Sequence, residues 1–136
     1  MKEITRKWVL FARADLDAAE LQFRYGGKRG SAYQIAVFHC HQAIEKLLKA
    51  HFIEQDKEVR KNHDLIQLRT EINLEFPKEL SVIIENLHPH YLLPRYPDLA
   101  FRPAFSFSYT RSNTRKILSD TSKLFLWLER LLKKKK

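Results

Sequence analysis

The chain has 136 residues, of which 44% are apolar and 30% charged, and it contains only three glycines. This composition is enough to fill one core and is typical of a folded helical domain, which excludes a disordered or two-domain chain. A single cysteine excludes an intramolecular disulfide, and no stretch approaches the roughly 20 apolar residues of a membrane span. We therefore expect one cytoplasmic domain that does not cross a membrane.

The formal net charge is +9, and four of the positive charges come from the lysines at positions 133–136. Lysines interact favourably with the negative end of a helix macrodipole, so this tail is interpreted first as a solvated helix end. Binding of an anionic partner remains the alternative.

The first predicted helix covers residues 5–25. Apolar side chains recur there at steps of three and four residues, which is the periodicity of one helix face: Trp8, Ala12, Leu16, Ala19 and Phe23. Gly26 and Gly27 follow, and glycine ends a helix cheaply because it adopts the left-handed conformation without a Cβ clash.

The second predicted helix covers residues 31–55 and contains no proline or glycine. Its apolar stripe has the same spacing and is flanked by three alanines: Tyr33, Val37, Cys40, Ile44, Leu47 and His51, with Ala36, Ala43 and Ala50. We expect it to be the spine of the bundle, with the first and last helices antiparallel to it.

Two shorter helices are predicted next. Asn62 is a good N-cap for a short helix that carries Leu65, Leu68 and Ile72, and Pro77 suits the first turn of a helix that ends near His88.

Four prolines, at positions 89, 94, 97 and 103, then predict an irregular segment over residues 89–110 that caps one end of the bundle. Alternation of Phe105, Phe107 and Tyr109 with serines would also suit a short strand, but no second strand is available to pair with it. The last helix is predicted to start near Ser112 or Asn113, and its wide apolar stripe should pack against the first two helices.

Several motifs now occur in one order. They are Trp8 with Ala14-Asp15-Leu16, the run from His41 to Ala50 (HQAIEKLLKA), His63-Asp64-Leu65, and the run from Tyr91 to Asp98 (YLLPRYPD). In order and spacing the chain resembles a HEPN domain, the nucleotide-binding domain of higher eukaryotes and prokaryotes, from beginning to end.

This resemblance implies an all-α, antiparallel up-and-down four-helix bundle with an additional short helix, commonly present as a homodimer. It also implies a minimal nucleotidyltransferase as partner, in a two-component system that is often of the toxin–antitoxin type. Many relatives cleave RNA without a metal, using an Arg followed after four to six residues by a His. No Arg of this chain has a His at that spacing. We therefore predict a module that binds a nucleotide or RNA rather than an enzyme.

The histidines do not form a metal-binding pattern. His39 and His41 are two residues apart on a predicted helix, so their side chains point about 200° apart. His88 and His90 flank a proline, but no cysteine or carboxylate cluster stands near them in sequence. We expect neither a metal nor a cofactor.

The candidate binding residues come from four regions. The resemblance implies that the Tyr-x-x-x-Arg-Tyr-Pro-Asp motif lies near a cleft beside the second helix, close to a polar row on that helix. His63, which follows the second helix, and a basic stretch interleaved with aromatics are the other two. The candidates are Gln42, Glu45, Lys46, Lys49, His63, Tyr91, Arg95, Tyr96, Asp98, Arg102, Arg111 and Arg115.

Each of these regions also has a structural interpretation. The aromatics would pin the proline-rich segment to the core, and Arg95 would pair with Glu45 or Asp98 inside the bundle. Two rival functions stay open: a metal-independent endoribonuclease with a different arrangement of Arg and His, and a purely structural dimerisation partner.

Overall fold

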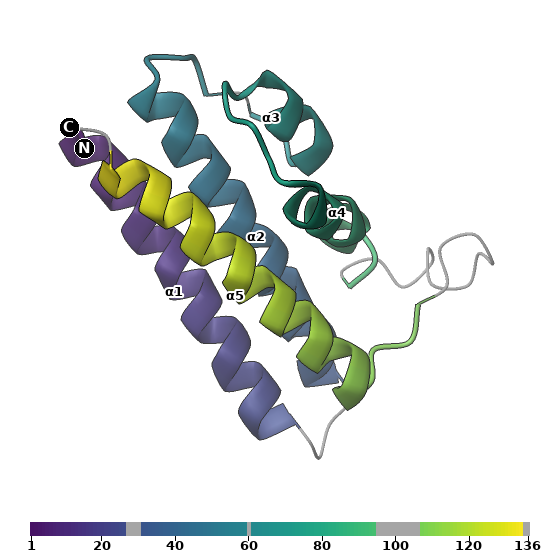
Figure 1. The fold of residues 1–136 in the computed structure, drawn as a ribbon. Coiled ribbons are helices and arrows are strands. Elements are labelled where there is room, and N and C mark those ends of the chain that lie inside the picture. The colour runs from purple at the N-terminus through teal and green to yellow at the C-terminus, as the bar shows by residue number, and fades with distance from the viewer. Residues whose placement is uncertain (27–30, 60, 95–106, 135–136) are drawn as a thin grey trace.

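The computed structural model describes residues 1–26, 31–59, 61–94 and 107–134, and all regular structure in these ranges is helical. The elements are α1 (Glu3–Tyr25), α2 (Ser31–Glu54), α3 (Leu65–Glu71), α4 (Lys78–Leu87), the 3₁₀ helix η2 (His88–Tyr91) and α5 (Arg111–Lys134). In Figure 1 the three long helices α1, α2 and α5 lie side by side, and α3 and α4 form a second group beside them. The all-α bundle predicted from the sequence is confirmed.

The core is built from the stripes that the sequence predicted. Ala12, Leu16 and Ala19 of α1 are buried, and so are Val37, Cys40, Ile44 and Leu47 of α2. Helix α5 contributes Leu124, Phe125, Leu128 and Leu132. Because α2 packs extensively on α1 and α5 and also contacts α3 and η2, it is the spine of the fold.

The direction of α5 corrects one expectation. Near the C-terminal ends of both helices the ring of His51 bonds to the backbone oxygen of Leu128 over 2.8 Å, and nearer their N-terminal ends Cys40 contacts Thr121. Helix α5 therefore runs parallel to α2 and antiparallel to α1, as Figure 1 also shows. The prediction of an antiparallel α5 was wrong because α3 and α4 lie on the way back along the bundle, so α5 starts from the same end as α2.

The predicted caps are shifted by about two residues. The N-cap of α3 is Asp64, whose Oδ1 accepts a hydrogen bond from the backbone N–H of Gln67 over 2.9 Å, whereas Asn62 bonds only to the Gln67 side chain. Helix α5 begins at Arg111, where Thr110 and Asn113 each accept a bond from the other's backbone N–H.

The segment after α4 is not irregular from its first residue, because η2 occupies His88–Tyr91. Residues 107–110 form no strand. Phe107 and Tyr109 pack against His90, with ring centroids 4.7 and 5.5 Å away, and the Tyr109 hydroxyl bonds to His90 Nδ1 over 2.7 Å. These two aromatics do pin the segment; Phe105 lies outside the described residues.

Within the described ranges, no helix combines the length and the apolar composition needed to cross a bilayer.

Candidate functional site

A cleft lies where the residues before α3 meet η2 and the turn after it. It has a volume of about 560 Å³, and it is lined by two short stretches of chain: Asn62, His63 and Asp64 from before α3, and His88, Pro89, Tyr91, Leu92 and Leu93 from η2 and the turn after it. Two motifs singled out in the sequence, His63-Asp64 and the start of the Tyr91 run, thus line the same cleft.

His63 is fixed in this cleft from two directions. Its Nδ1 lies 2.9 and 3.0 Å from the two carboxylate oxygens of Glu45, and its ring stacks on Tyr91 with 4.0 Å between centroids and 15° between planes. The contact with Glu45 turns Nδ1 toward the bundle, so Nε2 is the ring nitrogen on the side away from the carboxylate. The Tyr91 ring therefore covers one face of the positioned His63 imidazole, whose side chain is 45% exposed.

Glu45 can hold His63 because its charge is paired inside the bundle. The Glu45 side chain is nearly buried, and Lys49, one turn further along α2, donates a hydrogen bond to Glu45 Oε2 over 3.0 Å. A buried carboxylate without such a partner would be costly, so Lys49 supports the Glu45–His63 contact. Lys49 itself is 7% exposed and faces Glu45 rather than solvent.

Further histidines surround the base of the cleft. His41 is fully buried, with its Nδ1 3.7 Å from Glu45 Oε1 and its ring 5.5 Å from that of Tyr91. Burial lowers the pKa of His41 to about 3, with smaller contributions from His88, His63 and His90, which the backbone of His63 partly offsets. Neither ring nitrogen has a hydrogen-bond partner at bonding distance among the described residues. His41 is therefore a neutral imidazole.

Two more histidines complete the group. Burial lowers the pKa of His90 to about 4, and burial also raises the pKa of its partner Tyr109. His88 lies at the cleft wall with its Nδ1 3.7 Å from Asp64 Oδ1. Sequence reasoning missed His41 and Asp64 as parts of this site, since only the packing of η2 on α2 brings them together.

The polar row predicted on α2 divides between two faces. Glu45 contacts His63 and Lys49, whereas Lys46 forms an ion pair with Asp15 of α1, which also bonds to His39 Nδ1 over 2.9 Å. Burial tends to raise the pKa of Asp15, but the hydrogen bonds from His39 and Lys46 outweigh it and leave the pKa below its ordinary value. Gln42 is half-buried on the same helix.

The basic stretch is also divided. The guanidinium groups of Arg111 and Arg115 lie over the ring of Phe23 at the end of α1, 4.7 and 5.6 Å from its centroid. This cation–π contact places them at the junction of α1 and α5, away from the cleft. Arg95, Tyr96, Asp98 and Arg102 lie outside the described residues, so their predicted roles stay predictions.

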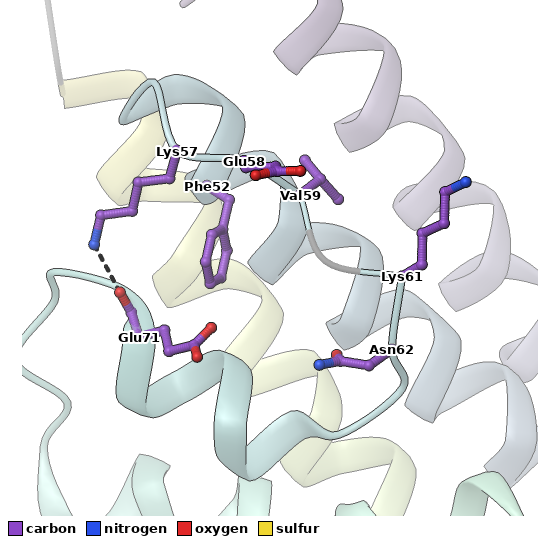
Figure 2. A pocket seen from close by; sticks show the side chains of 7 residues that line it. All are labelled: Phe52, Lys57, Glu58, Val59, Lys61, Asn62 and Glu71. Carbon is purple, nitrogen blue, oxygen red and sulfur yellow. Dashed lines mark hydrogen bonds between the residues drawn. The ribbon is translucent and has the colours of Figure 1, made fainter.

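A second hollow lies between the end of α2 and α3 and is shown in Figure 2. The Lys57 ammonium donates to the backbone oxygen of Glu71 across it over 2.7 Å, and charged side chains of both signs line its rim. Asn62 borders both hollows, but this one has no histidine among its described lining residues. Within the described ranges, no three His, Cys, Asp or Glu side chains converge as metal ligands.

Comparisons with known proteins agree on the fold. A family model described as the HEPN domain matches residues 5–131. The chain is similar to the crystal structure of TT1696 from Thermus thermophilus, with 24% identity, a TM-score of 0.81, and 95% of this chain and 98% of that one covered. It is also similar to ST0689, an archaeal HEPN homologue, with 23% identity, a TM-score of 0.72 and coverages of 96% and 98%. No curated protein matches the chain.

Proposed function

The chain belongs to the HEPN domain family, and from its cleft we propose that it is a helical module that binds a nucleotide or a short stretch of RNA. The observation that carries the proposal is the stack of His63 on Tyr91, held in place by Glu45. Because Tyr91 covers one face of the imidazole, a base would stack on the other face, and phosphate oxygens would accept hydrogen bonds from donors at the cleft.

The charge of the chain supports an anionic ligand. The formal net charge is +9, and both His63 and His88 line the cleft. Arg95, Tyr96, Asp98 and Arg102 follow in sequence from Leu93, which lines the cleft. The two arginines remain candidates for phosphate contacts, and Tyr96 and Asp98 remain candidates for contacts with the base or the ribose.

Nucleotide binding at the cleft is tested with a panel of ribonucleoside monophosphates and triphosphates and a labelled single-stranded RNA. We expect Tyr91→Leu and His63→Ala to weaken binding at least about tenfold, since one base–aromatic stack is worth about 1–3 kcal/mol. Lys116→Ala, at an exposed lysine of α5, is the matched control and should bind normally. Melting curves show whether each variant is folded.

Two results would overturn the assignment. The first is the absence of binding to any probe, together with no rise in melting temperature. This result would favour the alternative that the protein is a purely structural dimerisation partner. The second is normal binding by His63→Ala but loss of binding by Arg111→Ala with Arg115→Ala, which would move the site to the junction of α1 and α5.

A second candidate function, RNA cleavage without a metal, is favoured by the same Glu45–His63 contact. A carboxylate that orients an imidazole is an arrangement found in general bases, and Nε2 of His63 would take the 2′-hydroxyl proton. The 2′-oxygen then attacks the phosphorus and the bond to the 5′-oxygen breaks. The leaving 5′-oxygen takes a proton from solvent water, and His63 returns its proton to solvent. The products are a 2′,3′-cyclic phosphate and a 5′-hydroxyl.

One assay on end-labelled RNA in the presence of EDTA distinguishes cleavage from binding. An enzyme should lose cleavage in His63→Ala even at protein concentrations that restore full RNA binding, and Glu45→Gln should reduce the rate with little effect on affinity. RNA that is bound but stays intact in the unmodified protein argues against the enzyme.

We also propose that the protein is a cytoplasmic homodimer that works with a minimal nucleotidyltransferase in a two-component, toxin–antitoxin-like system. The support is membership of the family and the absence of any Arg-x4-6-His spacing in the chain, which favours action through a partner. A nucleotidyltransferase encoded by the neighbouring gene should co-purify with this chain in a fixed ratio. An isolated gene would contradict this part of the proposal.

A further inference from the structure

Helix α1 carries a second apolar stripe, on a face turned away from its core contacts. Its members are spaced alternately by three and four residues over the whole helix: Ile4, Lys7, Phe11, Ala14, Ala18, Leu21 and Tyr25. We call this stripe the outer seam. Ile4 is 49% exposed, Phe11 66%, Leu21 55% and Tyr25 76%.

The exposure of the outer seam is unusual for a helix that already buries one face. A surface helix of a globular protein normally has charged and polar residues opposite its core stripe, whereas Lys7 is the single charged member of this seam. Its spacing of 3.5 residues on average is the heptad repeat by which two helices pack along their length. The seam is about 30 Å long at 1.5 Å per residue. Figure 1 shows α1 at the edge of the bundle, on the side away from α3 and α4.

From this we infer that the outer seam is the dimer interface, in which α1 packs antiparallel against α1 of a second copy. This deepens the homodimer in the proposed function by assigning its surface. A parallel pair would place each Lys7 beside Lys7 of the second copy and each Phe11 beside Phe11 of the second copy. The antiparallel pair instead places Phe11 opposite Ala14 of the second copy and Ile4 opposite Leu21 of the second copy, so the large Phe11 ring meets a small residue, and Tyr25 extends past the paired stretch.

Charge complementarity also supports a second copy of this chain as the partner of the outer seam. In this register Glu3, which flanks the seam at one end of α1, meets Arg24 of the second copy, which flanks it at the other end. The twofold symmetry makes this contact twice. Both side chains are exposed in the single chain, so neither requires a rearrangement to form it. Lys7 faces Ala18 of the second copy, and one polar residue in an apolar seam fixes register.

A hollow along the seam provides room for the second helix. Ile4, Lys7, Trp8 and Phe11 line it on α1, and Lys46 borders it on α2. The nucleotide cleft lies between α2, α3 and η2 instead. The two clefts of such a dimer therefore face outward and are each complete within one chain.

The test is the molar mass of the full chain in solution, by light scattering and sedimentation over a range of concentrations. We expect a dimer, and we expect Phe11→Glu and Leu21→Glu each to raise the dimer dissociation constant at least about tenfold by burying a charge in the seam. Leu126→Glu, at a 43% exposed leucine of α5, is the matched control and should leave the dimer intact.

Charge reversal tests the register. Glu3→Arg or Arg24→Glu alone should weaken the dimer, and the two together should restore it, because each pair is then reversed in sign. The variants should still bind nucleotide, so the failure of this inference is distinguishable from failure of the cleft. A monomeric chain, a dimer insensitive to Phe11→Glu, or no restoration by the double reversal would overturn it.

Discussion

Burial fixes the charge state of two histidines in this protein. His41 is fully buried beside Glu45, and His90 is buried beneath Phe107 and Tyr109. A protein interior disfavours a charged imidazole, so both stay neutral where a solvated histidine would already be protonated. Their neutrality keeps positive charge out of the core directly below the cleft.

The stability of the fold should therefore fall as the pH falls. Below pH 6.5 the unfolded chain binds a proton at each of these histidines, whereas the folded chain does so only at its lowered pKa, about 3 for His41 and about 4 for His90. The stabilising effect is complete above pH 6.5 and is lost toward pH 4, at roughly 1.4 kcal/mol per pH unit for each histidine. Urea unfolding between pH 7.5 and 4.5 measures this slope.

His41→Phe identifies the origin of the slope. This substitution removes one of the two buried histidines. The free energy of unfolding should then depend about half as steeply on pH, whatever its value at pH 7.5. The carboxylates with lowered pKa values, Asp15 and Glu54, have ordinary values of 3.8 and 4.5 and act mainly below this window. An unchanged slope in His41→Phe would show that His41 is protonated in the fold.

At the scale of the elements, the local sequence predicts where a helix lies in the chain but not the direction in which it packs. Helices α1 and α2 were placed to within two residues because apolar periodicity and glycine are local features. The direction of α5 was not predictable in this way, because it depends on the path of α3 and α4. Asn62 and Asp64 are both good N-cap residues, and the sequence alone does not say which one precedes the first helical turn.

Substitutions at these two positions measure the cap directly. Asp64→Ala removes the acceptor for the Gln67 N–H and should lower the free energy of unfolding by about 1 kcal/mol, while Asp64→Asn should retain most of it. Asn62→Ala is the control, because it loses only a bond between side chains. Denaturant unfolding of all three compares them, and a larger loss in Asn62→Ala than in Asp64→Ala would contradict the assigned cap.

At the scale of the whole molecule, the fold brings several of the predicted candidates into contact. Glu45 bonds to both Lys49 and His63, and His63 stacks on Tyr91, although these residues come from separate motifs. Their role in binding stays a prediction. Lys46 does not join these contacts, since a polar row on a helix spans enough of its circumference to face two neighbours. His41 was assigned to no role because its burial against Tyr91 depends on how η2 packs on α2.

The net charge of the chain and the cleft should contribute separately to RNA binding. Four of the nine net charges belong to residues 133–136, and Figure 1 shows the C-terminal end of α5 beside the start of α1. Replacing these four lysines with serine should leave mononucleotide affinity unchanged if the proposed site is the cleft. It should make binding of long single-stranded RNA less dependent on salt.

The salt dependence sets the size of the effect. Each phosphate that a lysine neutralises contributes about 0.7 to the slope of log affinity against log salt for a single strand, so four lysines account for at most about 3. Fluorescence titrations of both probes at several salt concentrations measure it. An equal loss of affinity for the mononucleotide would make the tail part of the site. An unchanged slope for long RNA would leave the lysines as a solvated helix end, with binding due to the cleft alone.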